Sequence, residues 1–177
     1  MTLSDTPAAL PLPEINRMNH HDFRRVLGHV FERSPWIAER AWTRRPFASR
    51  EALHEAMLGA MREASREEQL ALLRAHPDLA IRAARAEALS AASRLEQSGA
   101  GLDRLTDEEY ARFDRLNARY REKFGFPFII AVRRHAKAAI LAAFERRVRN
   151  TVDAEIETAL AEVSDITRLR LETLVKA

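Results

Sequence analysis

Apolar side chains recur at steps of three and four along most of this chain, and that spacing constrains the fold more than any other feature. Residues spaced in this way lie on one face of an α-helix. Glycine, which weakens helices, occurs only five times in 177 residues. The sequence therefore predicts an all-α fold, a bundle of amphipathic helices whose apolar faces form the core.

Polar residues that favour the start of a helix stand directly before several of these apolar stripes. Asn19 and Ser49 precede two of them, and Ser34 precedes Pro35, a residue favoured in the first helical turn. Side-chain oxygens at such positions accept hydrogen bonds from backbone N–H groups that the first turn leaves unpaired. We therefore expect helices to begin next to Asn19, Ser34 and Ser49.

Two later helix starts carry the stronger signal of a capping box, in which two residues three positions apart cap each other. One box is formed by Ser65 and Glu68, the other by Thr106 and Glu109. Both pairs stand before apolar stripes. They predict two further helices with well-defined first turns.

Gly125 should end the helix that starts at Thr106, because glycine adopts the left-handed conformation in which many helices end. Two more stripes predict helices over residues 140–148 and from about residue 151 onward. The length and the 46% hydrophobic content fit one domain over residues 14–177. The proline-spaced residues 1–13 predict a flexible tail before it.

Nothing in the sequence predicts export or insertion into a membrane. Residues 1–15 lack a positively charged segment followed by a long apolar one, and no apolar run approaches the ~20 residues that a membrane helix needs. We expect a cytoplasmic protein that has no membrane partner.

Charge and residue types narrow the classes of function. The 29 basic and 26 acidic residues leave a net charge of only +3, and the signs alternate along the chain. We therefore expect no nucleic-acid partner, although a non-catalytic basic helical binding module stays open. The absence of cysteine excludes a thiolate nucleophile, and no histidines have the H-E-x-x-H spacing, so we expect no metal site.

His76 stands where a leucine-rich helix meets a proline, in the stretch LLRAHPDLA over residues 72–80. Pro77 disfavours the helical conformation at the residue before it, so the helix should end there and present the imidazole from a fixed corner. Histidine titrates near neutral pH, which suits a catalytic acid or base. An ordinary histidine at a helix end is the alternative.

The stretch SRLEQSGAGL over residues 93–102 breaks the amphipathic pattern. On a helix, Ser93, Glu96 and Gln97 share one face at spacings of three and four. This face offers a hydroxyl, a carboxylate and an amide, which can recognise the donors and acceptors of a small polar heterocycle. A solvated helix end would show the same pattern.

The stretch KFGFPFIIAVRR over residues 123–134 is an apolar run that contains a proline, and it predicts one extended segment near residues 125–133. Pro127 keeps the residue before it extended. An extended strip in a helical protein leaves backbone N–H and C=O groups that need partners. A bound ligand could supply those partners, as could neighbouring side chains around a buried connection.

Four stretches together resemble one family. VFERSPWIAERAW with RPF shortly after it, AHPDLA, SRLEQSGAGL and YREKFGFPFIIAVR occur in this order between residues 30 and 133. In these stretches the chain is similar to the decarboxylases of 2-oxo-4-hydroxy-4-carboxy-5-ureidoimidazoline (OHCU), which act in urate breakdown. The predicted helical bundle agrees with the all-α fold of that family.

The resemblance implies the residues of an active site. It makes His76 the catalytic acid or base and Glu96 a second catalytic residue that orients the substrate. The remaining substrate contacts that it implies are Pro77, Ser93, Gln97, Phe128, Ile129, Ile130, Ala131, Val132 and Arg133. The strip from Phe128 to Val132 would line the pocket with its backbone.

The resemblance also implies the reaction, which is the conversion of OHCU to (S)-allantoin and carbon dioxide without a cofactor. The small-molecule substrate is then the expected partner, and a homodimer is compatible with the family. Ile81 and Arg82 depart from the glycine and lysine expected after HPDLA, so the resemblance does not define the start of the next helix, although the assignment of His76 stands. A lyase acting on another small anionic heterocycle is the alternative.

Overall fold

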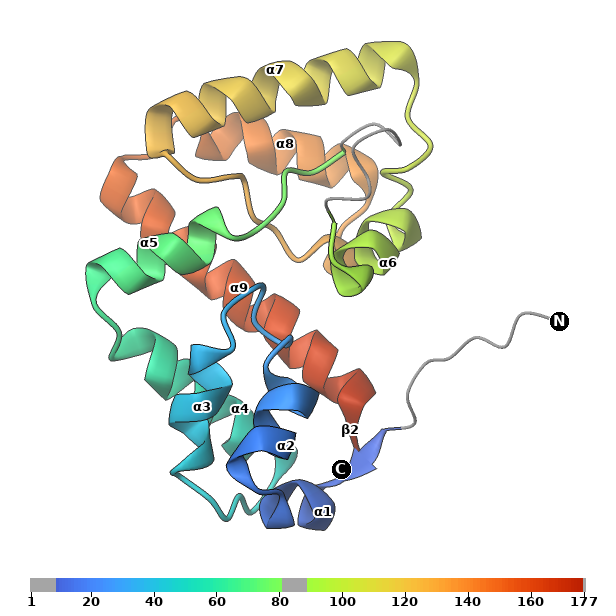
Figure 1. Cartoon of the computed structure of the whole chain (residues 1–177). Coiled ribbons are helices and arrows are strands. Elements are labelled where there is room, and N and C mark those ends of the chain that lie inside the picture. The colour runs from blue at the N-terminus through green and yellow to red at the C-terminus, as the bar shows by residue number, and fades with distance from the viewer. Residues whose placement is uncertain (1–8, 81–88, 177) are drawn as a thin grey trace, which may run out of the picture. The chain divides into compact units, whose positions relative to one another are not determined.

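The structure is a computed structural model that describes residues 9–80 and 89–176 and consists mainly of helices, as predicted (Figure 1). The unusual positions Ile81 and Arg82 lie outside the described residues. The elements in chain order are β1 (Leu10–Pro11), α1 (Leu12–Arg17), α2 (His20–Leu27), α3 (Trp36–Trp42), α4 (Arg50–Arg62), α5 (Arg66–Arg74), α6 (Ala91–Gly99), α7 (Asp107–Phe124), the 3-10 helix η2 (Val132–Arg134), α8 (Lys137–Arg147), α9 (Val152–Leu174) and β2 (Val175–Lys176).

Two of the predicted single-residue caps are confirmed. The Asn19 side chain accepts a hydrogen bond from the backbone N–H of Asp22 at 2.9 Å and starts α2. The Ser49 hydroxyl accepts from the backbone N–H of Ala52 at 3.0 Å and starts α4. These short-range bonds satisfy donors that the first helical turn leaves unpaired.

The predicted cap at Ser34 is wrong. α3 has Pro35 as its N-cap residue, and no side chain caps that helix. The Ser34 hydroxyl instead donates to the backbone carbonyl of Glu32 at 3.0 Å. Serine forms such local bonds readily, and they compete with capping.

Both predicted capping boxes are present. Ser65 accepts from the N–H of Glu68 at 3.2 Å, and the Glu68 carboxylate accepts from the N–H of Ser65 at 2.9 Å. Thr106 and Glu109 make the same pair of bonds at 3.2 and 2.8 Å. The helix that starts at the second box, α7, ends at Gly125, whose φ of +73° is left-handed as predicted.

The described residues form two compact units, the first containing those up to Ala64 and from Thr167 onward, the second those from Ser65 to Ile166. A single domain over residues 14–177 stays a prediction.

The first unit joins segments from both ends of the chain. β1 pairs in parallel with β2, so that Leu10 lies opposite Val175. α3 packs against both α2 and α4. Arg170, near the end of α9, forms a buried ion pair with Glu32 at 3.2 Å and donates to the carbonyl of Val30 at 3.2 Å.

Regular secondary structure begins within the segment 1–13 that was predicted to be a flexible tail. Leu10–Pro11 forms β1, and α1 begins at Leu12. Neither element was predicted, because two or six residues are too few for a hydrophobic period to stand out.

Tyr120 of α7 lies at the centre of an aromatic cluster in the second unit. The Tyr120 ring is fully buried, and its centroid lies 4.5–5.8 Å from those of four phenylalanine rings. These rings belong to Phe124, Phe126, Phe128 and Phe144. Because two of them lie in the segment after Gly125, the aromatic cluster holds that segment against α7 and α8.

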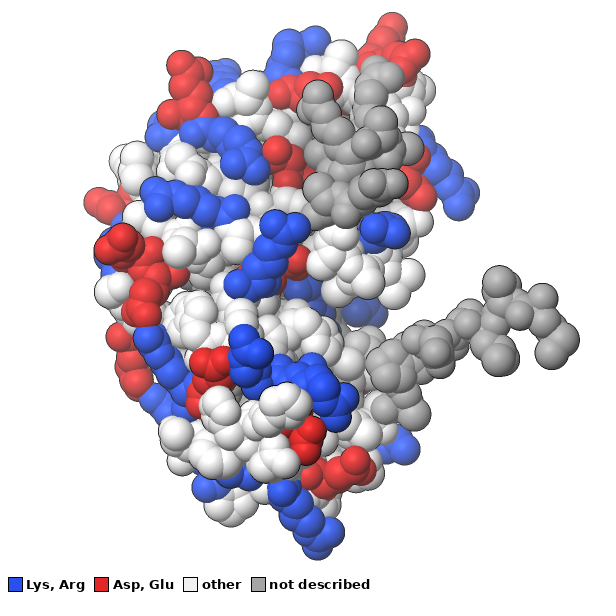
Figure 2. Space-filling view, viewed as in Figure 1, with Lys and Arg blue, Asp and Glu red and all other residues white. Residues whose placement is uncertain are grey.

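Charges of both signs are interspersed on the face shown in Figure 2, in agreement with their alternation in the sequence. Oppositely charged side chains also pair at the surface: Arg44 and Glu63 are both exposed and lie 2.6 Å apart. Among the described helices none is long and apolar enough to cross a membrane.

Candidate active site

His76 lies just beyond the end of α5, as predicted. The helix ends at Arg74, and Ala75 is its C-cap residue. The imidazole is buried, and its Nδ1 atom lies 3.0 Å from the carbonyl oxygen of Leu72. Because a carbonyl can only accept, Nδ1 carries the hydrogen, and Nε2 is the nitrogen that can take up or release a proton.

Side chains from α6 and α7 hold the turn that follows this histidine. The side-chain oxygen of Gln97 accepts from the N–H of Ala80 at 3.0 Å, and the side-chain nitrogen of Gln97 donates to the carbonyl of Asp78 at 3.3 Å. Asn117 donates to the carbonyl of Leu79 at 2.9 Å. Ala80 has a left-handed φ of +54°, a conformation that costs roughly 1–2 kcal/mol. These bonds help to stabilise the strained turn.

α6 carries the predicted polar face. The Ser90 hydroxyl caps the helix by accepting from the N–H of Ser93 at 3.1 Å. Ser93 and Gln97 are buried, and Glu96 is partly exposed. The two bonds of Gln97 use one of its two amide hydrogens and one lone pair of its oxygen, so the side chain retains a donor and an acceptor for other partners.

α6 contacts both of the other segments that the sequence singles out. Through Gln97 it holds the turn after His76, and it also packs against η2 at the end of the apolar strip. Pro77, half-buried, lies between His76 and the turn. The structure thus brings the histidine, the polar helix face and the end of the strip into one region of the second unit.

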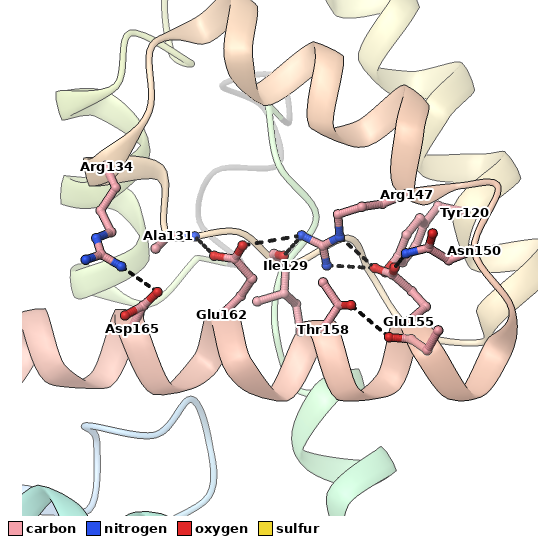
Figure 3. A network of polar contacts seen from close by, with 11 residues as sticks. Tyr120, Ile129, Ala131, Arg134, Arg147, Asn150, Glu155, Thr158, Glu162 and Asp165 are labelled. Carbon is pink, nitrogen blue, oxygen red and sulfur yellow. Dashed lines mark hydrogen bonds and ion pairs between the residues drawn. The ribbon is translucent and has the colours of Figure 1, made fainter.

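The apolar strip connects α7 to η2 and is buried over residues 128–132. Arg147 of α8 donates to the carbonyl of Ile129 at 2.8 Å, and Glu162 of α9 accepts from the N–H of Ala131 at 2.9 Å (Figure 3). No hydrogen bond from another described residue reaches the backbone N–H or C=O of Ile130. They are among the buried backbone groups of the strip for which a ligand would be a partner.

The strip ends in η2 with two exposed arginines, Arg133 and Arg134. Arg134 pairs with Asp165 of α9 at 2.5 Å. Arg133 is the second exposed arginine next to the strip, and its positive charge can attract an anionic molecule.

A buried ion pair between Arg147 and Glu155 adjoins the strip, because Arg147 also binds the carbonyl of Ile129. Glu155 is fully buried and accepts from Nε and Nη2 of Arg147 at 2.9 and 2.7 Å, from Asn150 at 2.7 Å and from the Tyr120 hydroxyl. Burial, followed by the hydrogen bond to Glu155, raises the pKa of Tyr120 well above its usual value. The phenol therefore stays protonated and remains a donor.

Four buried or partly buried polar residues shape this region and were not predicted from the sequence: Asn117, Arg147, Glu155 and Glu162. A usable signal was present for Arg147, which follows Phe144 by three residues and so lies on the apolar stripe of its helix. A charged residue on a buried helix face needs a partner. That partner lies on another helix, which the stripe does not identify.

The assembled groups suit proton transfer and recognition of a small polar molecule. The imidazole of His76 can exchange a proton, while Glu96, Ser93 and the backbone of Ile130 offer acceptors and donors. Among the residues that the structure describes, no group of three or more histidine, aspartate or glutamate side chains could hold a metal ion.

Comparisons with known proteins agree with the resemblance. The sequence model of the OHCU decarboxylase family matches residues 16–172. The 2-oxo-4-hydroxy-4-carboxy-5-ureidoimidazoline decarboxylase of Haloferax volcanii is 48% identical over 162 residues, which cover 92% of this chain and 94% of that protein.

Two solved structures are also similar. The crystal structure of (S)-allantoin synthase matches with a TM-score of 0.76 and 30% identity over 94% of this chain, which spans about half of that longer chain (54%). The crystal structure of OHCU decarboxylase in the presence of (S)-allantoin matches with a TM-score of 0.62 and 27% identity, covering 77% of this chain and 87% of that one. Together with the family match along most of its length, these similarities show that the chain belongs to the OHCU decarboxylase family.

Proposed function

We propose that this protein converts OHCU to (S)-allantoin and carbon dioxide in urate breakdown, as a carboxy-lyase. The observation that carries the proposal is the meeting of three segments in the second unit, where α6 contacts both the turn after His76 and the end of the strip. The relative from Haloferax volcanii is named for this decarboxylation, and a related structure was determined in the presence of (S)-allantoin.

Loss of carbon dioxide leaves an electron pair on the ring carbon that carried the carboxylate. Donors directed at the ring heteroatoms over which this charge spreads lower the barrier, and each is typically worth ~3 kcal/mol. We assign this task to the N–H of Ile130 and the second amide hydrogen of Gln97. Glu96 accepts from ring or ureido N–H groups and orients the substrate, and Ser93 adds a hydroxyl contact.

The remaining assignments concern the walls of the site. Phe128, Ile129, Ala131 and Val132 line the pocket together with Pro77, and Arg133 attracts the substrate carboxylate. Because the N–H of Ala131 already donates to Glu162, the contribution of that residue is its place in the wall and not a donor to the substrate.

His76 moves the proton in this proposal. The hydrogen bond from Nδ1 to Leu72 fixes the orientation of the ring, so Nε2 gives or takes the proton on one side of the substrate. Delivery to one face yields one enantiomer. General acid–base catalysis of this kind contributes roughly 10²–10⁴ in rate. The substrate's own ring accommodates the electron pair, so the reaction as proposed uses no cofactor.

The wider setting follows from the same proposal. The chain acts as one domain over residues 14–177, in the cytoplasm, on a small-molecule substrate. A homodimer is compatible with this activity, which requires neither a nucleic acid nor a membrane.

Circular dichroism of the product tests the proposed function. OHCU freshly generated from urate is expected to decay unaided to racemic allantoin, so the optical signal reports the enzyme better than the rate does. The expected result with the wild-type protein is (S)-allantoin alone. Racemic allantoin formed at the unaided rate would refute the proposal.

His76→Asn tests the role of the histidine. Asparagine places an N–H donor near the position of Nδ1, so it can keep the bond to Leu72 while it removes the titratable nitrogen. We expect kcat to fall at least ~100-fold, because the proton transfer is lost, with little change in thermal stability. His21→Ala, at an exposed histidine, is the control and should keep full activity. Wild-type turnover by His76→Asn would exclude this role.

A further inference from the structure

Arg147 is nine-tenths or more buried, and its guanidinium bonds in two directions (Figure 3). Nε and Nη2 both donate to one oxygen of Glu155, while Nη1 donates to the carbonyl of Ile129 at 2.8 Å and lies 3.8 Å from Glu162. The guanidinium also lies over the Phe128 ring, 4.4 Å from its centroid. A planar fork can hold such partners in fixed directions, which a lysine ammonium cannot.

Glu155 keeps this fork in place. Besides Arg147, its carboxylate accepts from the side-chain amide of Asn150 at 2.7 Å and from the hydroxyl of Tyr120. Donors from α7, α8 and the segment before α9 thus orient the carboxylate. Because the carboxylate is oriented, the guanidinium that binds it is oriented as well.

The strip is anchored at two alternate residues. The carbonyl of Ile129 binds Arg147, and the N–H of Ala131 binds Glu162. In an extended chain, the polar backbone groups of successive residues point to opposite sides. Anchoring both neighbours of Ile130 to α8 and α9 therefore directs its own N–H and C=O away from these anchors.

From this arrangement we propose that Arg147 is a positioning residue for the decarboxylation. It does not touch the substrate, but it sets the direction in which Ile130 presents its backbone groups to the substrate. This inference rests on the proposed function. Displacing a reacting group by about 1 Å can cost 10²-fold in rate, so a small shift of the strip has a measurable effect.

The first test is Arg147→Lys, which keeps a positive charge beside Glu155 but loses the fork that also binds Ile129. We expect a folded protein whose kcat is about 10- to 100-fold lower, with KM changed far less, because the strip no longer directs its donor in the transition state. The allantoin that it forms should be less purely (S). Arg146→Lys, on an exposed neighbour in the same helix, is the matched control and should behave as wild type.

The second test removes the other anchor and leaves the Arg147–Glu155 pair intact. Glu162→Ala leaves the N–H of Ala131 without its acceptor and should lower kcat in the same way. Glu162→Gln retains a side-chain oxygen and should recover most of the loss. The two Glu162 variants test whether the anchoring of the strip directs Ile130 even if Arg147→Lys does not fold: wild-type kcat from Glu162→Ala would then refute the positioning role.

The outcomes separate the two proposals. Wild-type kcat and pure (S)-allantoin from Glu162→Ala and from folded Arg147→Lys would refute the positioning role. They would leave the proposed function intact. A kcat that falls only in proportion to the folded fraction, with the handedness of the product kept, would refute it too. If the wild-type protein itself forms no excess of (S)-allantoin, the proposed function fails, and the role of Arg147 in that reaction fails with it.

Discussion

Tyr120 combines packing and hydrogen bonding in the buried part of the second unit. Its ring contacts four phenylalanines, and its hydroxyl donates to the carboxylate of Glu155. Because burial and this bond raise its pKa, the folded state binds the phenol proton more tightly than the unfolded chain does. The protonated Tyr120 therefore contributes to the free energy of unfolding. This contribution is fully present below the unfolded pKa of about 10 and is lost as pH rises above that value toward the raised pKa of the folded state.

The Tyr110→Phe variant makes this effect observable, because Tyr120 is then the only tyrosine. We expect the ultraviolet absorbance of tyrosinate to appear above about pH 10 only together with loss of helical circular dichroism, and near pH 10 in urea-unfolded protein. Ionisation near pH 10 with the helices intact would contradict the raised pKa.

α7 is an element that local signals define at both ends. The capping box of Thr106 and Glu109 starts it, and the left-handed Gly125 ends it. A Cβ atom added at Gly125 would have no atom within 4 Å, so only the backbone conformation requires glycine there.

Gly125→Ala should therefore lower the free energy of unfolding by about 1 kcal/mol, the cost of a left-handed alanine. Gly99, the last residue of α6, offers the matched control because it also faces open space but has no left-handed φ. Gly99→Ala should leave stability unchanged or raise it by up to about 1 kcal/mol. Urea denaturation measures both, and equal destabilisation by the two variants would exclude this explanation.

At the scale of the whole molecule, residues far apart in the sequence close the first unit. Arg170 and Glu32 are 138 positions apart, and both side chains are buried. The pairing of β1 with β2 joins the two ends of the described chain in the same unit. The stability of this unit thus depends on contacts that no local segment contains.

Arg170→Met should lower the free energy of unfolding by about 3–5 kcal/mol, because it removes the guanidinium that pairs with the buried carboxylate of Glu32 at 3.2 Å. Adding Glu32→Leu should recover part of the loss, since the buried charge is then gone. Arg168→Met is the control: its partner Glu172 is one turn away and exposed, so the loss should stay near 0.5 kcal/mol or below. Urea denaturation would contradict this if both single variants cost the same.

Whether a feature could be predicted from the sequence depended on the range of the interactions that form it. The capping boxes at Ser65 and Thr106 were predictable because each joins residues three positions apart. The expected cap at Ser34 failed because its hydroxyl has another local acceptor, the carbonyl of Glu32. The residues proposed for the site came from motifs, and their assigned contacts with substrate stay predictions.

By itself, the sequence determined the helical class, the starts of several helices and the family, because periodicity, capping and motifs are properties of contiguous residues. Only the tertiary structure decided that Gln97 holds the turn after His76, and that Arg147 and Glu162 anchor the strip on both sides of Ile130. The physical reason is that a buried polar group takes its partner from whichever element packs against it. That partner is chosen by the packing of several helices together.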